Sequence, residues 1–241
     1  IVGRQNDKVE DEIEAVKNLI SIDDLDGLSA EQVAEEYRRM SDLVVYAEPV
    51  IQIELEPTLN FREIAEKPAV EANEPNDPMF AEQWALNNAG QNGGKAKADI
   101  DALKAWLKTK GSKKVVVAVL DTGVDYTHLD LVSNIWTRPD VVPQYKDDEL
   151  GTINDLHGFN AADNRTDPMD DNGHGTHCAG VIGAEGDNDE GIAGINWNVK
   201  IMPLKFMGRG GFGTTKDAIE AINYAVQRKR DGVNVRVINA S

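Results

Sequence analysis

Hydrophobic residues follow two patterns that alternate along this chain, continuous runs and a spacing of three or four positions. Short continuous apolar runs are typical of buried strands, and apolar residues spaced three or four positions apart predict helices. The strands are expected at 115–120, 199–204 and 233–238, and the helices at 99–110, 174–183 and 215–228. Alternating strands and helices of these lengths imply a parallel sheet with helices on both faces, the doubly wound α/β class.

Residues 1–56 have a different pattern, which predicts a separate small α+β unit. Val9, Ile13, Val16 and Ile20 have helical spacing, so a helix is expected over 7–21. Ser29 and Gln32 match a capping box that would begin a second helix ending at Met40. Apolar runs then predict strands at 43–49 and 50–55. Residues 57–72 contain prolines among charged residues, which favours an exposed linker.

The charge of the chain limits its partners. The formal net charge is -17, and residues 1–72 hold 18 acidic and 7 basic side chains. A phosphate-binding surface needs clustered lysine and arginine, so nucleic acid is not an expected partner. No apolar run has the length of a membrane span, so no membrane partner is expected either. The single cysteine excludes an internal disulfide.

Two short motifs carry the candidate chemistry. The first is Asp121-Thr122-Gly123, directly after a predicted strand, and the second is Gly173-His174-Gly175-Thr176-His177-Cys178 at the start of a predicted helix. A hydroxyl becomes a useful nucleophile when an imidazole accepts its proton, and that imidazole needs a buried carboxylate to orient it. Either motif alone is weak evidence. Together they predict Asp121 and His174 as two members of a catalytic triad.

These motifs, in this order, resemble those of the subtilisin-like serine proteases. Segments 74–80, 191–194 and 199–205 extend the resemblance, which covers 73–241 and is closest to the thermitase-like branch. It implies a subtilisin-like sheet, incomplete here, and a secreted serine endopeptidase acting on polypeptide substrates. Residues 1–56 then correspond to part of a prodomain that inhibits its own enzyme, and 57–72 contain the maturation bond. The implied substrate-binding residues are Gly211, Phe212, Gly213 and Ser241, and the implied supporting residues are His177 and Cys178.

The serine of the implied triad is not found in this sequence. The family places it in a downstream Gly-Thr-Ser-x-Ala motif, after an asparagine that serves the oxyanion hole. None of the six serines lies in such a motif. We expect the chain to be part of a longer precursor and to be inactive by itself. The alternative is a non-catalytic pseudoprotease or binding scaffold with the same fold.

The resemblance also implies a structural calcium ion. Its side-chain ligands would be Asp77, Asp130 and Asn188, and oxygen atoms of this kind are the ligands that calcium selects. Backbone carbonyl groups of Glu185, Glu190 and Ile192 would complete the shell. The alternative is a solvated acidic loop.

Two further metal sites are weaker hypotheses. A second calcium site would use Asp163, Asp167 and Asp170, but Arg165 stands among them and would repel a cation. His174 and His177 are one helical turn apart, a spacing that also allows zinc chelation.

Overall fold

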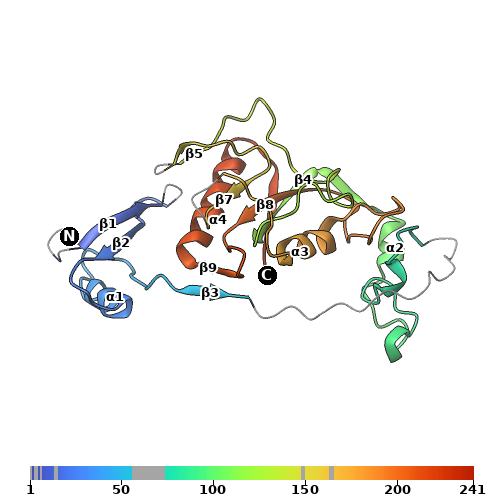
Figure 1. The fold of residues 1–241 in the computed structure, drawn as a ribbon, viewed down its shortest axis with the longest axis horizontal. Helices are drawn as coiled ribbons and strands as arrows, with labels where there is room; N and C mark the ends of the chain where they lie inside the picture. Colours follow the sequence, from blue (N-terminus) through green and yellow to red (C-terminus); the bar gives the residue numbers. More distant parts are fainter. Residues whose placement is uncertain are drawn as a thin grey trace.

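The computed structural model describes residues 2, 5, 7–13, 16–55, 74–147, 150–162 and 166–241. The predicted linker, 57–72, lies outside these residues. A four-stranded parallel sheet with the order β10-β4-β8-β7 forms the centre (Figure 1). Its strands are β4 (Gly111–Asp121), β7 (Phe159–Asn160), β8 (Asn198–Lys205) and β10 (Val235–Ala240). All three predicted strands are therefore present.

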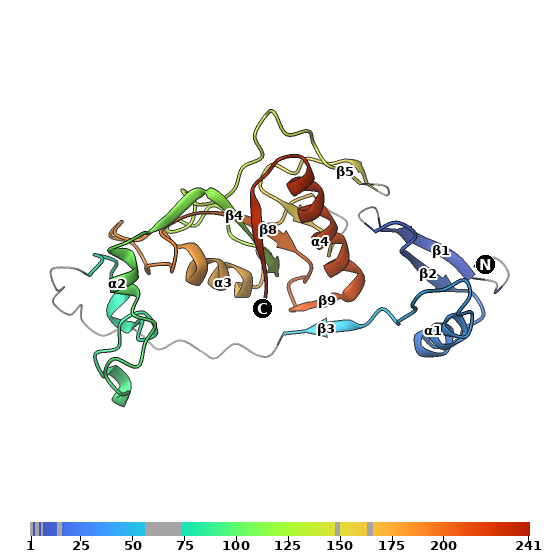
Figure 2. The same ribbon diagram turned by 180° about the vertical axis from the view of Figure 1, so that it is seen from behind.

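The sheet is covered on both faces, as the sequence predicts. Helix α3 (His174–Gly183) packs against one face, where Ala179 contacts the cluster that contains Val117 and Val119. Helix α4 (Thr215–Arg230) covers the other face, where Tyr224 packs with Ala118. Because side chains of β4 alternate between the two faces, successive residues of one strand enter different cores. Figure 2 shows α3 and α4 from behind.

Short elements surround the sheet. They are η2 (Phe80–Glu82), η3 (Gln91–Gly93), β5 (Lys146–Asp147), β6 (Gly151–Thr152), β9 (Phe212–Thr214) and α2 (Ala102–Trp106). The prediction of a helix over 99–110 is wrong in length, because only 102–106 are helical. Trp106 anchors α2 with its ring centroid 4.8 Å from that of Trp197. Leu107, which directly follows α2, is 79% exposed, since the chain turns there toward β4.

The N-terminal unit differs from its predicted structure. In place of a helix over 7–21, β1 (Asp7–Glu12) pairs antiparallel with β2 (Ile20–Asp24). Strand pairing overrides the helical spacing: of the four apolar positions, only Ile13 is buried. The hydroxyl of Tyr37 donates to Asp7 over 2.7 Å, which holds the hairpin against the next helix.

That next helix, α1 (Ala30–Arg38), is confirmed together with its capping box from Ser29 and Gln32. The predicted strand at 43–49 is wrong, because this segment lies outside any sheet and leaves Leu43 and Val45 exposed. Within 50–55 the structure has the short strand β3 (Gln52–Glu54), which pairs with β9. Among the described residues, no helix is long and apolar enough to cross a bilayer.

Candidate active site

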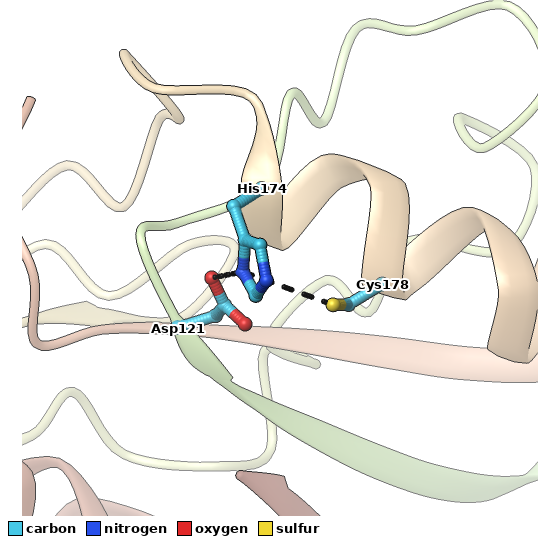
Figure 3. Close-up of side chains that lie close together, drawn as sticks. All are labelled: Asp121, His174 and Cys178. Atoms are coloured by element: carbon cyan, nitrogen blue, oxygen red, sulfur yellow. Dashed lines mark hydrogen bonds and ion pairs between the residues drawn. The ribbon is translucent and has the colours of Figure 1, made fainter. Parts of the chain in front are cut away.

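Asp121 and His174 meet at the carboxyl end of β4. Nδ1 of His174 lies 2.7 Å from Oδ1 of Asp121 (Figure 3). The carboxylate is fully buried, whereas the imidazole is 21% exposed. A buried carboxylate in this position holds the proton on Nδ1 and stabilises the imidazolium. The other ring nitrogen, Nε2, is then the basic atom of the pair.

Glycines beside His174 permit this contact. A Cβ atom at Gly175 would overlap with the carbonyl oxygen of Gly123 and would lie 3.0 Å from Cβ of Asp121. Gly173, the N-cap of α3, has φ of 104°, a conformation that side chains with a Cβ rarely adopt. The Gly-His-Gly sequence therefore lets the start of α3 approach the end of β4 closely.

The carboxylate of Asp121 is held by its neighbour as well as by the histidine. The backbone N–H of Thr122 donates to Oδ1 over 2.7 Å. Oδ2 is buried and has no hydrogen-bond partner among the described residues. The carboxylate is thus oriented through a single oxygen, which is the one facing His174.

Cys178 lies on α3, one turn after His174. Its sulfur is 3.9 Å from Nδ1 of His174 (Figure 3). Burial raises the pKa of the Cys178 thiol to about 11, and the negative charge of Asp121 adds to the shift. The thiol is therefore protonated at neutral pH, which makes it a poor nucleophile. A supporting role for Cys178 therefore stays a prediction, and a role as nucleophile is not favoured.

His177 does not join the cluster around His174. In the described part of the chain, one group of three side chains offers ligand atoms within 4.8 Å of one another, and it consists of Asp121, His174 and Cys178. The zinc hypothesis needs His174 and His177 together. The structure does not support that pairing.

The predicted substrate-binding strand lies beside the dyad of Asp121 and His174. The side-chain amide of Asn172, two residues before His174, donates to the carbonyl of Arg209 over 3.0 Å. Residues 212–214 form β9, and the N-terminal segment is already paired with it. Gln52, Ile53 and Glu54 lie opposite Thr214, Gly213 and Phe212. The pairing continues where the N–H of Leu55 donates to the carbonyl of Gly211 over 2.9 Å.

Ser241 follows β10, whose carboxyl end lies next to that of β4. Ala240 is opposite Leu120, so the residue after each of them is at the same edge of the sheet. The Ser241 hydroxyl acts to lower the pKa of the Cys178 thiol, against the larger effect of burial, so the two side chains are neighbours. The last predicted substrate-binding residue is therefore close to the dyad.

The predicted calcium ligands also come together, away from the dyad. Asp77 and Asp130 are each 3% exposed. One oxygen of Asp77 accepts the N–H of Asp187 over 2.7 Å. Asp130 accepts the side-chain amide of Asn188 over 3.0 Å and the N–H of Ile192 over 2.9 Å. Segments 110 positions apart in the sequence thus form one cluster.

The chemistry of this cluster fits a hard cation. Burial raises the pKa of Asp77 to about 6, and the charges of Asp130 and Asp187 act in the same direction. The second oxygen of Asp77 is buried without a hydrogen-bond partner among the described residues. The carboxylate of Glu185 accepts a hydrogen bond from Ser133, and the N–H of Glu185 donates to the carbonyl of Asp130 over 2.9 Å, which places this residue next to the cluster. The N–H of Glu190 donates to Asn188 over 3.1 Å, which shapes the loop.

The second predicted calcium site would need Asp170 as a ligand, and the structure argues against that role. Asp163 and Arg165 lie outside the described residues, and Asp167 accepts hydrogen bonds from Tyr126 and Met169. Asp170 accepts five hydrogen bonds, while a carboxylate has about four lone-pair sites. Its oxygens are therefore committed to the protein. We conclude that Asp170 is not a calcium ligand.

Two residues near the dyad were not singled out for a role there by the sequence. Asp170 accepts the N–H of Thr176 in the first turn of α3 over 2.9 Å, although it stands three residues before the N-cap, Gly173, where the sequence gives no capping signal. Lys205 is 2% exposed, and its ammonium group donates to the carbonyl of Thr122 and to Asp171, each over 2.6 Å. A lysine at the end of an apolar strand gives no sequence signal for this contact.

Comparison with known proteins identifies the family of this chain. The model of the Subtilase family matches residues 112–241, which is more than half of the chain. The chain belongs to the subtilase family. The subtilase is 37% identical over 171 residues to the thermophilic serine proteinase of Bacillus sp. (strain AK1), covering 70% of this chain and 37% of that protein. It is 35% identical over 162 residues to the cell wall-associated protease of Bacillus subtilis (strain 168), covering 66% and 16%.

A solved structure shows the same fold. Fervidolysin from Fervidobacterium pennivorans, described as a keratinolytic enzyme related to subtilisin, matches this subtilase with a TM-score of 0.64 at 24% identity. The match covers 100% of this chain and 33% of fervidolysin. The architecture is thus subtilisin-like α/β, as the sequence predicts. The chain spans between 16% and 37% of the length of these relatives.

Proposed function

We propose that this subtilase is part of a secreted serine endopeptidase that is made as an inhibited precursor and stabilised by calcium. The observation that carries the proposal is the hydrogen bond of 2.7 Å between His174 and the buried carboxylate of Asp121. An imidazole held in this way is a general base, and the family context makes peptide hydrolysis the reaction that needs it. The nucleophile would be a serine beyond Ser241, in the family's chain order.

In this mechanism Nε2 of His174 accepts the proton of the serine hydroxyl as its oxygen attacks the peptide carbonyl. Asp121 stabilises the imidazolium that forms. His174 then gives the proton to the departing amine, and an acyl-enzyme remains. A water molecule, deprotonated by the same nitrogen, hydrolyses the acyl-enzyme and frees the serine.

Covalent labelling of the full-length protein tests this proposal. A fluorophosphonate reacts with a serine that is activated by a neighbouring base, so we expect one label per protein molecule. The label should be lost in a His174→Ala variant. A full-length protein that takes no label would contradict the peptidase proposal and favour the binding-scaffold alternative.

We further propose that residues 51–55 block the substrate-binding strand in the precursor. They extend along β9, and main-chain hydrogen bonds such as the one from Leu55 to Gly211 support the pairing. An extended peptide substrate would add to a free strand in the same manner. Contacts of Lys216 on α4 with Glu10 at 3.4 Å and Asp11 at 3.5 Å would help to hold the N-terminal unit in place.

Replacing Leu55 by proline in the full-length precursor is expected to weaken this inhibition. Proline lacks the N–H that donates to Gly211, and one such bond contributes about 1 kcal/mol. The peptidase activity of freshly purified precursor should rise about five-fold, measured as the initial rate on a peptide substrate. Leu55→Ala is the matched control, because it loses the same side chain but keeps the N–H. Equal rates for the two variants would argue against inhibition by strand pairing.

The calcium proposal predicts a stability difference. Asp77, Asp130 and Asn188 would hold the ion, which would neutralise two buried carboxylates. Calcium at about 100 times its Kd is expected to stabilise the full-length protein by about 2.7 kcal/mol over chelator. In Asp130→Ala the melting temperature should no longer depend on calcium. The control is Asp140→Ala, an exposed aspartate outside this cluster, which should keep the full response. A melting temperature that is the same in calcium and in chelator would refute the site.

A further inference from the structure

We propose that Thr122 and Asp170 form a positioning pair that sets the hydrogen bond between Asp121 and His174. The inference rests on the proposed function, because it assigns how the general base of that reaction is held. Neither residue would touch the substrate. Their role would be to fix the start of α3 relative to the end of β4.

The Thr122 hydroxyl connects the two elements that carry the dyad. It donates to Oδ1 of Asp170 over 2.9 Å and accepts the backbone N–H of Gly175 over 2.9 Å. Thr122 directly follows Asp121, and Gly175 directly follows His174. One buried hydroxyl thus links the residues next to both members of the dyad.

Asp170 orients that hydroxyl and caps α3 at the same time. Its carboxylate accepts the N–H groups of Asn172, Gly173 and Thr176 over 2.9, 3.0 and 2.9 Å. It also accepts the hydroxyl of Thr176 over 2.6 Å. Burial would raise the pKa of the Asp170 carboxyl, but these hydrogen bonds outweigh burial and the pKa lies below its ordinary value. An ionised acceptor makes each of the bonds stronger.

The β4 side of the contact is anchored independently. The ammonium group of Lys205 donates to the carbonyl of Thr122 over 2.6 Å, and the N–H of Phe206 donates to the carbonyl of Asp121 over 2.9 Å. The backbone at 121–122 is therefore fixed by β8. The hydroxyl of Thr122 then determines where α3 begins relative to this fixed point. Because a shift of about 1 Å in a reacting group costs on the order of 100-fold in rate, loss of the hydroxyl should be visible in catalysis.

The test compares Thr122→Val with Thr122→Ser in the full-length protein. Valine keeps the branched shape but removes the hydroxyl, whereas serine keeps the hydroxyl. We expect kcat for peptide hydrolysis to fall about 100-fold in Thr122→Val with KM nearly unchanged, and to stay within a few-fold in Thr122→Ser. Thr127→Val is the control, because Thr127 bonds only within its own turn to Asp125 and is exposed. It should behave as the unchanged protein.

A second readout does not require activity. The low-field proton NMR resonance of the Nδ1–H of His174 reports its hydrogen bond to Asp121. It should move upfield or be lost by exchange in Thr122→Val and persist in Thr122→Ser. If valine prevents folding, Thr122→Ala removes the hydroxyl without adding apolar bulk and should give the same change.

The outcomes separate this inference from the proposed function. An unchanged resonance in a folded Thr122→Val or Thr122→Ala protein would overturn the positioning role. Equal losses of kcat in Thr122→Val and Thr127→Val would overturn it too, because they would indicate a general loss of stability. If the unaltered full-length protein shows no peptidase activity, the proposed function fails, and the resonance alone decides whether the pair positions His174.

Discussion

His174→Ala in the full-length subtilase is expected to lower kcat for peptide hydrolysis by a factor on the order of 10⁶, the size of the loss when the general base of the subtilisin triad is removed. The physical reason is that a serine hydroxyl is a weak nucleophile without a base to accept its proton. Binding of the substrate does not depend on that proton transfer, so KM should change little. Steady-state kinetics on a peptide substrate measures both quantities.

His177→Ala is the control for this experiment. His177 is also on α3 but lies outside the cluster of Asp121, His174 and Cys178. Its removal should cost far less than the loss of His174. Circular dichroism should show that both variants are folded, although His174→Ala leaves the buried carboxylate of Asp121 with the N–H of Thr122 as its hydrogen-bond donor. If the His174→Ala protein retained substantial peptidase activity, His174 would not be the general base.

Asp155→Ala is expected to destabilise the protein by about 3–5 kcal/mol, the cost of breaking a buried ion pair. Asp155 is fully buried between two guanidinium groups, at 3.0 Å from Arg138 and 3.0 Å from Arg228. It also accepts the hydroxyl of Tyr224 over 2.9 Å. Arg228, which lies on α4, is itself only 2% exposed, so alanine would leave its buried charge with Asp231, at 2.6 Å, as its acidic partner. Urea denaturation of the full-length protein measures the loss.

Two further variants serve as comparisons for Asp155→Ala. Asp155→Asn keeps the shape and one acceptor but loses the charge, so it should be intermediate between aspartate and alanine. Asp140→Ala removes an exposed carboxylate of the same region and should change the free energy of unfolding by less than about 0.5 kcal/mol. A urea midpoint for Asp155→Ala equal to that of Asp140→Ala would show that the network contributes no net stability.

Local sequence determined the central sheet and the elements that carry the dyad. The apolar runs that become β4 and β8 are buried on both faces, so continuous apolar residues predict these strands directly. The run that becomes β10 is at the edge of the sheet, where Val237 is 51% exposed. Helix α3 begins at His174 and ends at Gly183, as predicted, because glycines mark its start and small residues line its buried side. The pairing of Asp121 with His174 was also predictable, since the two motifs supply the carboxylate and the imidazole that a catalytic triad requires.

Tertiary structure decided what local patterns leave open. The helical spacing in 7–21 gave way to a hairpin, because pairing of β1 with β2 and the contact of Asp7 with Tyr37 outweigh local preference. The partners of Asp155 are far away in the sequence, so nothing near it signals a buried network. The carboxylate of Asp170 is a group that could bind a metal ion. Only the structure shows that its oxygen atoms already accept five hydrogen bonds from the protein. Sequence alone thus determined which residues could carry the chemistry of this subtilase. The folded chain decided which of them meet, because hydrogen bonds between distant segments depend on positions that only packing sets.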